Sequence, residues 1–332
     1  MTTLAGSSTS LNADGFGTSA TFTYPIGTAV DTSGNILVTD ANTIRKVTPL
    51  GAVSTVTGSA TSGYVDGLGT TARFNSPKSL TIATTGVIYV TDTGNNRIRV
   101  IDTTGSVTTL SGSSSTTFAD GRGTKATFNS PVGIGLDISG NLYVADYSNC
   151  RIRLISASTK NVTTFAGSGT CSWLDGVGTS ARFYNPQGLA VTSSGTVYVT
   201  DYGNSRLRAI TSAAVVTTLA GSSASNADGI GTSAYFNFPS ISQSVAVDTV
   251  GNIYVTDGNN NKIRIVSSVG YVTTLAGSAS SAWADGTKTS SSFYTPAGVA
   301  VDTNGYVYVS DYNNHRVRRI VIKSQGKPVH VL

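Results

Sequence analysis

Carboxylates are the side chains of this chain with the greatest potential for chemistry. All 17 acidic residues are Asp, Glu is absent, and two His, His315 and His330, accompany them. A general acid or base is most often His, Glu or Asp, and Asp together with Asn and carbonyl oxygens suits Ca²⁺. The spacing of the Asp residues therefore decides between a chemical site and a repeated structural role.

Twelve of the Asp residues form two regular series, each with gaps of 52 to 57 residues. The first series begins an Asp-Gly pair, at Asp14, Asp66, Asp120, Asp175, Asp228 and Asp285. The second series ends an alternating apolar run, at Asp40, Asp92, Asp146, Asp201, Asp257 and Asp311. This regularity indicates Asx-type turns or partners of Arg rather than acids and bases.

Basic residues follow the second Asp series in every copy. Thirteen of the 22 basic residues lie there: Arg45, Lys46, Arg97, Arg99, Arg151, Arg153, Arg206, Arg208, Lys262, Arg264, Arg316, Arg318 and Arg319. Arg residues at i and i+2 lie on one side of a strand. We interpret them as ion-pair partners between neighbouring repeat units. A nucleic-acid surface is less favoured, since the net charge is only +5 over 332 residues.

The repeat unit that positions these residues contains four strands. In residues 162–210, "VTTFAG", "LAVT", "TVYVTD" and "RLRAI" read as short strands, separated by segments rich in Gly, Asp, Ser and Pro. Six such copies, at about 2–54, 55–108, 109–163, 164–217, 218–273 and 274–326, fill residues 1–332 as one domain. The sequence therefore predicts an all-β fold, a six-bladed β-propeller with four-stranded antiparallel blades.

Three copies resemble repeats of the NHL propeller family: "FYNPQGLAVTSSGTVYVTDYGNSRLRAI", "FNSPVGIGLDISGNLYVADYSNCRIRLI" and "FYTPAGVAVDTNGYVYVSDYNNHRVRRI". The shared frame is Phe-x-x-Pro-x-Gly, an apolar strand, Asp-x-x-Gly, Tyr-Val-x-Asp and Asn-x-Arg-Ile-Arg. Copy two departs from it at Lys78 and Ser79, copy five carries extra residues at 240–244, and copy six lacks the second Gly after Asp285. The resemblance implies a rigid disc used as a recognition platform.

Enzymatic chemistry is not expected. Lyases and hydrolases among related propellers hold metals near the channel through His, Asp or Glu, whereas no His cluster exists here, which disfavours zinc. The channel mouth is predicted to carry Ile26, Lys78, Val132, Gln187, Ser240 and Ala297, a mixed and mostly uncharged set. No cofactor is indicated, and calcium held by Asp, Asn and carbonyl oxygens remains the alternative.

The ring is predicted to close through the N-terminus. Residues 1–6 match the end of a copy, and the sixth copy stops at "RVRRIVI", before its own "TTLAG" strand. The N-terminal strand can therefore complete the last blade. The segment 326–332, "GKPVHVL", is a rival for the same place, with Pro328 tolerable only at an outer edge. The start of the chain on a mid-repeat strand suggests a domain of a longer protein or a processed chain.

Aromatic residues are the candidates for binding. Tyr64, Phe118, Trp173 and Trp283 stand two residues before an Asp-Gly pair, and Tyr147, Tyr202 and Tyr312 follow an Asp of the second series. Alternation of strand direction puts both kinds of loop on one face. These rings are expected either to pack against neighbouring loops or to contact a partner, since Trp and Tyr dominate binding hot spots.

Two Cys and one sequon suggest the environment of the protein. Cys150 and Cys171 fall in loops on that same face, so a disulfide is predicted. Asn161-Val162-Thr163 is a weak glycosylation signal. With few charged residues and no apolar run long enough to cross a bilayer, the pair favours an extracellular or cell-surface location.

The sequence thus predicts a non-catalytic module that binds a protein or glycan through the face with the Asp-Gly loops. Two alternatives remain open: a structural subunit of a surface assembly, built from copies of itself or a larger parent protein, and a calcium-dependent lyase or lactonase-like enzyme. Nucleic-acid binding is the least favoured.

Overall fold

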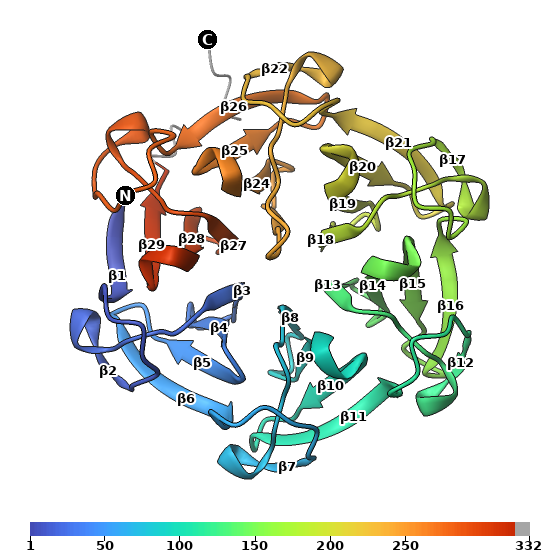
Figure 1. Ribbon diagram of the computed structural model, residues 1–332, viewed down its shortest axis with the longest axis horizontal. Coiled ribbons are helices and arrows are strands. Elements are labelled where there is room, and N and C mark those ends of the chain that lie inside the picture. Colours follow the sequence, from blue (N-terminus) through green and yellow to red (C-terminus); the bar gives the residue numbers. More distant parts are fainter. Residues whose placement is uncertain (323–332) are drawn as a thin grey trace.

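The computed structural model describes residues 1–322, which form six antiparallel sheets arranged as blades around a central channel (Figure 1). We letter the strands of each blade a to d from the channel outward. The predicted six-bladed β-propeller is therefore confirmed. Within residues 1–322 the only helical segments are three-residue 3₁₀ turns, and none of them is long enough to cross a membrane.

The strands occupy equivalent positions in each blade. Strands a are β3 (Pro25–Val30), β8 (Ser79–Ile82), β13 (Pro131–Leu136), β18 (Pro186–Val191), β23 (Val245–Val247) and β27 (Pro296–Val301). Strands b are β4 (Ile36–Asp40), β9 (Ile88–Asp92), β14 (Leu142–Asp146), β19 (Val197–Asp201), β24 (Ile253–Asp257) and β28 (Tyr306–Asp311). Strands c are β5 (Thr43–Val47), β10 (Arg97–Ile101), β15 (Arg151–Ile155), β20 (Arg206–Ile210), β25 (Lys262–Val266) and β29 (Arg316–Val321).

The outer strands complete each blade. Strands d are β6 (Ala52–Gly58), β11 (Ser106–Gly112), β16 (Asn161–Ala166), β21 (Val215–Ala220), β26 (Tyr271–Ala276) and, in blade 6, β1 (Thr2–Gly6). Five blades also gain a two-residue strand beyond strand d: β2 (Gly15–Phe16), β7 (Gly67–Leu68), β12 (Gly121–Arg122), β17 (Gly176–Val177) and β22 (Gly229–Ile230). This fifth strand is the Asp-Gly loop, which anchors itself on the blade that it leads into.

The 3₁₀ turns mark two kinds of loop. Those that follow the Asp-Gly pairs are η1 (Gly17–Ser19), η2 (Gly69–Thr71), η4 (Gly123–Lys125), η6 (Gly178–Ser180), η8 (Gly231–Ser233) and η10 (Lys288–Ser290). Those between strands b and c are η3 (Thr93–Asn95), η5 (Tyr147–Asn149), η7 (Tyr202–Asn204), η9 (Gly258–Asn260) and η11 (Tyr312–Asn314). Blade 1 joins β4 to β5 by two residues and has no 3₁₀ turn there.

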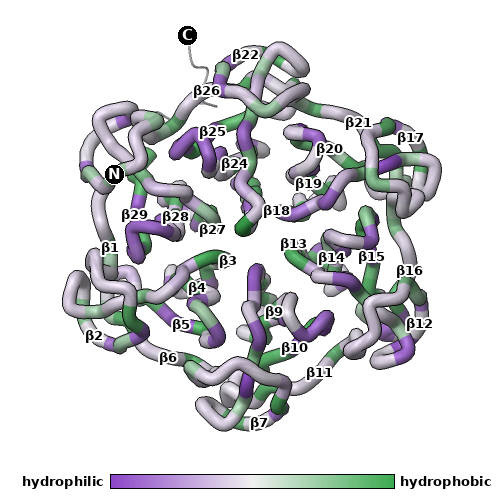
Figure 2. Tube along the Cα trace, viewed as in Figure 1, coloured by the Kyte–Doolittle hydropathy of each residue, from purple (hydrophilic) through white to green (hydrophobic). Residues whose placement is uncertain are grey.

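The hydrophobic core lies between blades rather than within them. Tyr143 of blade 3, for example, packs against Val197 and Val199 of blade 4. Strand β19 is buried at all five positions, because both faces of a blade are covered by neighbours. Figure 2 shows hydrophobic colour along β3 and β13 beside the channel and paler colour on the outermost strands. At the hub a Cβ on Gly133 would overlap the carbonyl oxygen of Gln187 in the next blade, so this position requires glycine.

The ring closes through the N-terminal strand, as predicted. Strand β1 pairs antiparallel with β29, with Thr3 opposite Arg318 and Ala5 opposite Val317. The terminal amine donates to the carbonyl oxygen of Gly286 at 2.7 Å, which ties the same strand to the last Asp-Gly loop. The rival segment 326–332 lies outside the described residues.

A charge placed inside this closing strand should open the ring. Ala5 is completely buried, so Ala5→Glu is expected to lower the free energy of unfolding by about 3–5 kcal/mol, as for other uncompensated buried charges. Thr2→Glu, at an exposed position of the same strand, is the control and should cost less than about 1 kcal/mol. Guanidinium-induced unfolding measures both variants, and equal losses would contradict closure by β1.

Candidate functional site

The two faces of the disc differ in what they carry. The loop face consists of the Asp-Gly loops, at the outer rim in Figure 1, and the loops between strands b and c, nearer the channel. The turn face, on the opposite side, consists of the short turns between strands a and b and between strands c and d. All the predicted binding aromatics lie on the loop face.

The Asp-Gly carboxylates hold the outer strand of their blade. Asp14 accepts hydrogen bonds from the Thr55 amide at 3.1 Å and the Thr55 hydroxyl at 3.0 Å, and Asp175 and Asp228 bond to Thr218 and Thr274 in the same way. The expected Asx turn is therefore wrong for these Asp residues. An Asx turn occurs instead at Asp31, in the turn after strand a, which accepts from the amides of Ser33 and Asn35.

The second Asp series is completely buried, and each member pairs with a completely buried Arg. These Arg residues are Arg45, Arg99, Arg153, Arg208, Arg264 and Arg318. In blade 4 the guanidinium of Arg208 lies 2.7 Å from Asp201 and 2.7 Å from Asp175, and also donates to two carbonyl oxygens. These ion pairs join strands b and c to the Asp-Gly loop of the same blade. The prediction of ion pairs between blades was wrong.

Links between blades come instead from the last residue of the b–c loop in five of the six blades. Asn96 accepts from the Ser130 amide of the next blade at 2.8 Å, and Asn261 accepts from the Thr295 amide at 2.9 Å. His315 bonds through Nδ1 to the carbonyl oxygen of Thr23 at 2.8 Å. In blade 3 this position is Cys150, and its disulfide with Cys171 confirms the predicted bridge.

Burial governs the protonation of the second Asp series. It raises the pKa of Asp40 and of Asp311 to about 6, against hydrogen bonds from backbone amides and the paired Arg that act to lower it. At neutral pH both are ionised. Partial burial acts to raise the pKa of Asp14, but hydrogen bonds from Thr55 and Arg45 lower it overall. Carboxylates sealed from solvent in this way are poorly placed for proton transfer to a substrate.

No grouping of three or more His, Cys, Asp or Glu side chains suited to a metal occurs in residues 1–322. His330 lies outside the described residues.

The outer aromatics each stack against the first Arg of strand c. Tyr64 lies 3.8 Å from the guanidinium carbon of Arg97, Phe118 lies 3.9 Å from that of Arg151, Trp173 lies 4.4 Å from that of Arg206, and Trp283 lies 4.5 Å from that of Arg316. The four aromatic side chains are still 42–49% exposed. Each ring is therefore fixed by a cation on one side and open to solvent elsewhere.

The other two blades replace this stack with a polar pair. Asn12 donates to the Thr43 hydroxyl at 2.8 Å in blade 1, and Lys262 donates to Asn226 at 2.9 Å in blade 5. The aromatic stack is thus present only where strand c begins with Arg.

Tyrosines form a second aromatic group nearer the channel. Tyr147 and Tyr202 stack with ring centres 6.3 Å apart, and Tyr312 stacks on Tyr24 at 5.4 Å. Tyr24, Tyr184 and Tyr294 were missed by the sequence analysis, although each lies between the Phe and Pro of the repeat frame, and they are 41–46% exposed. We call the six residues the inner tyrosine group: Tyr24, Tyr147, Tyr184, Tyr202, Tyr294 and Tyr312.

The channel mouth on this face carries Ile26, Lys78, Val132, Gln187 and Ala297. In blade 5 the equivalent residue is Gln243 rather than Ser240, because the hub residue Gly188 meets Gln243 just as Gly27 meets Lys78. Burial lowers the pKa of Lys78, and no ion pair to it exists in residues 1–322. Gln187 is buried, and its Oε1 accepts no hydrogen bond from the described residues. Two amides and one amine therefore lie at the channel mouth, on the same face as the phenol groups of the inner tyrosine group.

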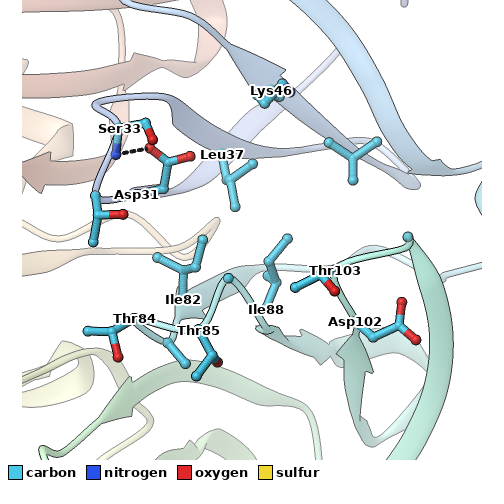
Figure 3. Close-up of a pocket in the computed structure, with 15 residues that line it drawn as sticks. Asp31, Ser33, Leu37, Lys46, Ile82, Thr84, Thr85, Ile88, Asp102 and Thr103 are labelled. Atoms are coloured by element: carbon cyan, nitrogen blue, oxygen red, sulfur yellow. Dashed lines mark hydrogen bonds between the residues drawn. The ribbon is translucent and has the colours of Figure 1, made fainter.

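The turn face contains a hollow of about 440 Å³ between blades 1 and 2, shown in Figure 3. It lies on the face opposite to all the predicted binding residues. Asn161 is also near this face, at the start of β16.

Two Arg residues on β20 test the buried network. Arg208→Met leaves Asp201 buried without its cation, so we expect a loss of about 3–5 kcal/mol in the free energy of unfolding. Arg206→Met removes a partly exposed stack on Trp173 and one hydrogen bond to the Asn204 carbonyl oxygen, and should cost about 1–2 kcal/mol. Denaturant unfolding of both variants gives the comparison. Similar losses would contradict a structural role centred on Arg208.

Sequence comparisons agree with the repeat frame. The NHL repeat pattern matches residues 74–101, 128–153, 183–210 and 293–320. The chain is 29% identical to Protein SUPPRESSOR OF QUENCHING 1, chloroplastic, of Arabidopsis thaliana, over 93% of this chain and 31% of that protein. It is 28% identical to NHL repeat-containing protein 2 of Bos taurus, over 93% of this chain and 47% of that protein. The chain thus spans less than half the length of either relative.

Solved structures share the fold. An auxiliary nutrient binding protein from Bacteroides thetaiotaomicron superposes with a TM-score of 0.71 at 17% identity, over 96% of this chain and 75% of that one. Virginiamycin B lyase from Staphylococcus aureus superposes with a TM-score of 0.54 at 15% identity, over 90% and 95%. At these identities the likeness concerns the fold alone. The chain is thus a six-bladed β-propeller in which four segments match the NHL repeat.

Proposed function

We propose that this protein is a non-catalytic recognition module that binds a protein or glycan through its loop face. The inner tyrosine group is the observation that carries the proposal. Its rings are partly exposed, and two pairs of them stack, Tyr147 on Tyr202 and Tyr24 on Tyr312. Tyr combines a large apolar surface with a hydrogen-bonding hydroxyl, which favours it at binding surfaces. The outer aromatics, fixed by Arg, extend the same surface toward the rim.

The remaining polar groups of the loop face support recognition rather than turnover. The Asp carboxylates of both series are held by Arg, Thr and backbone donors, although those of the Asp-Gly series are about half exposed. The other polar groups available to a ligand include phenol hydroxyls, amides and the amine of Lys78. Such groups orient a bound molecule through hydrogen bonds. The similarity to a lyase is one of fold and transfers no activity to this chain.

An extracellular or cell-surface location is part of the proposal. The Cys150–Cys171 bridge supports it, because disulfides persist in oxidising compartments. A glycan on Asn161, near the turn face, would leave the loop face free. The alternative of a structural subunit draws on the two terminal segments that compete for one place, of which β1 pairs with β29 and 326–332 lies outside the described residues.

Removal of the inner tyrosines should abolish binding without unfolding the disc. The variant Tyr147→Ser, Tyr184→Ser, Tyr202→Ser is compared with a control of three exposed turn-face residues, Ile138→Ser, Val250→Ser, Val269→Ser. Microarrays of oligosaccharides and of purified cell-surface proteins are the probes. We expect the native protein and the control to bind the same spots and the tyrosine variant to lose at least about tenfold in affinity. Equal binding by both variants would contradict the proposal.

Chelation separates this proposal from the calcium-dependent enzyme. Because the Asp carboxylates of both series are bonded within the blades, excess EDTA is expected to leave the midpoint of thermal unfolding unchanged within about 1 °C. Calcium added back after chelation is the control. A fall of several degrees that calcium reverses would favour a metal site and the enzyme alternative.

A further inference from the structure

The hollow between blades 1 and 2 on the turn face has an apolar floor and a polar rim. Its floor consists of Leu37 and Val56 from blade 1 and Ile82 and Ile88 from blade 2. Figure 3 shows Leu37 pointing across the gap toward Ile82 and Ile88, with Asp31 beside it. The polar rim carries hydroxyl groups, from Thr32, Ser33, Thr84, Thr85 and Thr103, and two charged side chains besides Asp31, Lys46 and Asp102. At about 440 Å³ it falls in the size range of small-molecule sites.

The other five blades carry larger side chains at two of the positions that line this hollow. The equivalent hollow between blades 6 and 1, which Tyr308 lines, is smaller, at about 320 Å³. Leu37 stands three residues before the Asp that ends strand b, where the other blades have Tyr89, Tyr143, Tyr198, Tyr254 and Tyr308. Each of these Tyr residues packs against the following blade. Val56 is likewise the smallest residue at its position, where the other blades have Leu4, Leu110, Phe165, Leu219 and Leu275. Blade 1 therefore has the smaller side chain at both positions, and both side chains line the hollow.

The hydrogen-bond acceptor for a tyrosine hydroxyl is nevertheless retained. In blade 5 the Tyr254 hydroxyl donates to Asp248 Oδ2 at 3.0 Å, and in blade 6 the Tyr308 hydroxyl donates to Asp302 Oδ2 at 3.2 Å. Asp248 Oδ2 also accepts from the Asn252 side chain at 2.8 Å. Asp31 Oδ2 accepts from the Asn35 side chain at the same distance, 2.8 Å. Blade 1 thus keeps the Asp–Asn pair and lacks only the phenol.

We propose that this hollow binds a small phenolic molecule, whose ring takes the place of the missing tyrosine and whose hydroxyl donates to Asp31 Oδ2. An apolar cavity of about 150 Å³ already accommodates benzene, so this hollow has room for a phenol with further substituents. The hydroxyl rim suits polar substituents on such a ring. The site lies on the opposite face from the inner tyrosine group and does not depend on the function proposed for that face.

The test uses p-cresol, the side chain of tyrosine, as the probe for the full chain. Calorimetry and ligand-detected NMR should show saturable binding with one site per chain. Toluene, which lacks the hydroxyl, should bind about tenfold more weakly, the worth of one hydrogen bond to a charged acceptor. Asp31→Asn should weaken p-cresol to a similar extent and leave toluene unchanged. Absence of saturable p-cresol binding up to about 10 mM would overturn the proposal.

Substitutions that restore a larger side chain in the hollow provide a second test. Leu37→Tyr restores the residue that the other five blades carry, and should abolish p-cresol binding while raising the midpoint of thermal unfolding. Val56→Phe, which copies Phe165 of blade 3, fills the hollow from its other wall if the first variant does not fold. Unchanged binding in a folded variant of either kind would overturn the proposal.

A capped tyrosine, N-acetyltyrosinamide, distinguishes a small molecule from a tyrosine side chain of a polypeptide. If it binds no more tightly than p-cresol, the assignment to a small phenol stands. An affinity tenfold or more above that of p-cresol would instead assign the hollow to a polypeptide tyrosine and overturn the small-molecule proposal.

Discussion

Six buried guanidinium groups are the constraint on which this propeller depends. A charge removed from water costs several kcal/mol unless it is paired and hydrogen-bonded. Each of the six Arg residues engages its two terminal nitrogens with two carboxylates and nearby carbonyl oxygens, as Arg208 does with Asp201, Asp175 and the carbonyl of Leu174, whereas Nε has no partner among the described residues. Only the planar fork of Arg reaches two carboxylates at once, which explains why this position is never Lys. The repeated Asp residues and the loops that carry them follow from this need.

Because the repeated Arg and Asp side chains pair with one another in every blade, the groups that distinguish one part of the surface from another are those that differ between copies. Tyrosines are present beside the channel in blades 1, 3, 4 and 6, and aromatic stacks occur at the rim in blades 2, 3, 4 and 6. On the opposite face, Leu37 and Val56 line a hollow of about 440 Å³, larger than the equivalent hollow of about 320 Å³ between blades 6 and 1. A symmetric frame therefore carries asymmetric surfaces, and the departures from the repeat are the places where binding is expected.

Much of the fold was predictable, because a strand pattern that is ambiguous in one copy becomes clear when it recurs at the same place in six copies. The blades, their strand order and closure by residues 1–6 all followed from it. The ion-pair partners did not follow from it: the Arg residues were predicted to form pairs between repeat units, whereas the structure pairs Arg208 with Asp175 within one blade. The extra residues at 240–244 move the channel-mouth position of blade 5 from the predicted Ser240 to Gln243. The hollow beside Leu37 depends on a side chain smaller than the Tyr of the other blades, and no sequence motif marks it. The inner tyrosines Tyr24, Tyr184 and Tyr294 were visible in the sequence but were read only as spacers.

The closing strand β1 imposes an order on folding. It pairs with β29, more than 300 positions later along the chain, so it remains without its partner until the sixth blade has been synthesised. Contacts of such high sequence separation form slowly, and an unpaired strand edge is a template for wrong pairing. During synthesis the growing ring therefore exposes an open edge at each end. The native disc is protected from edge-to-edge aggregation only after its first and last strands have met.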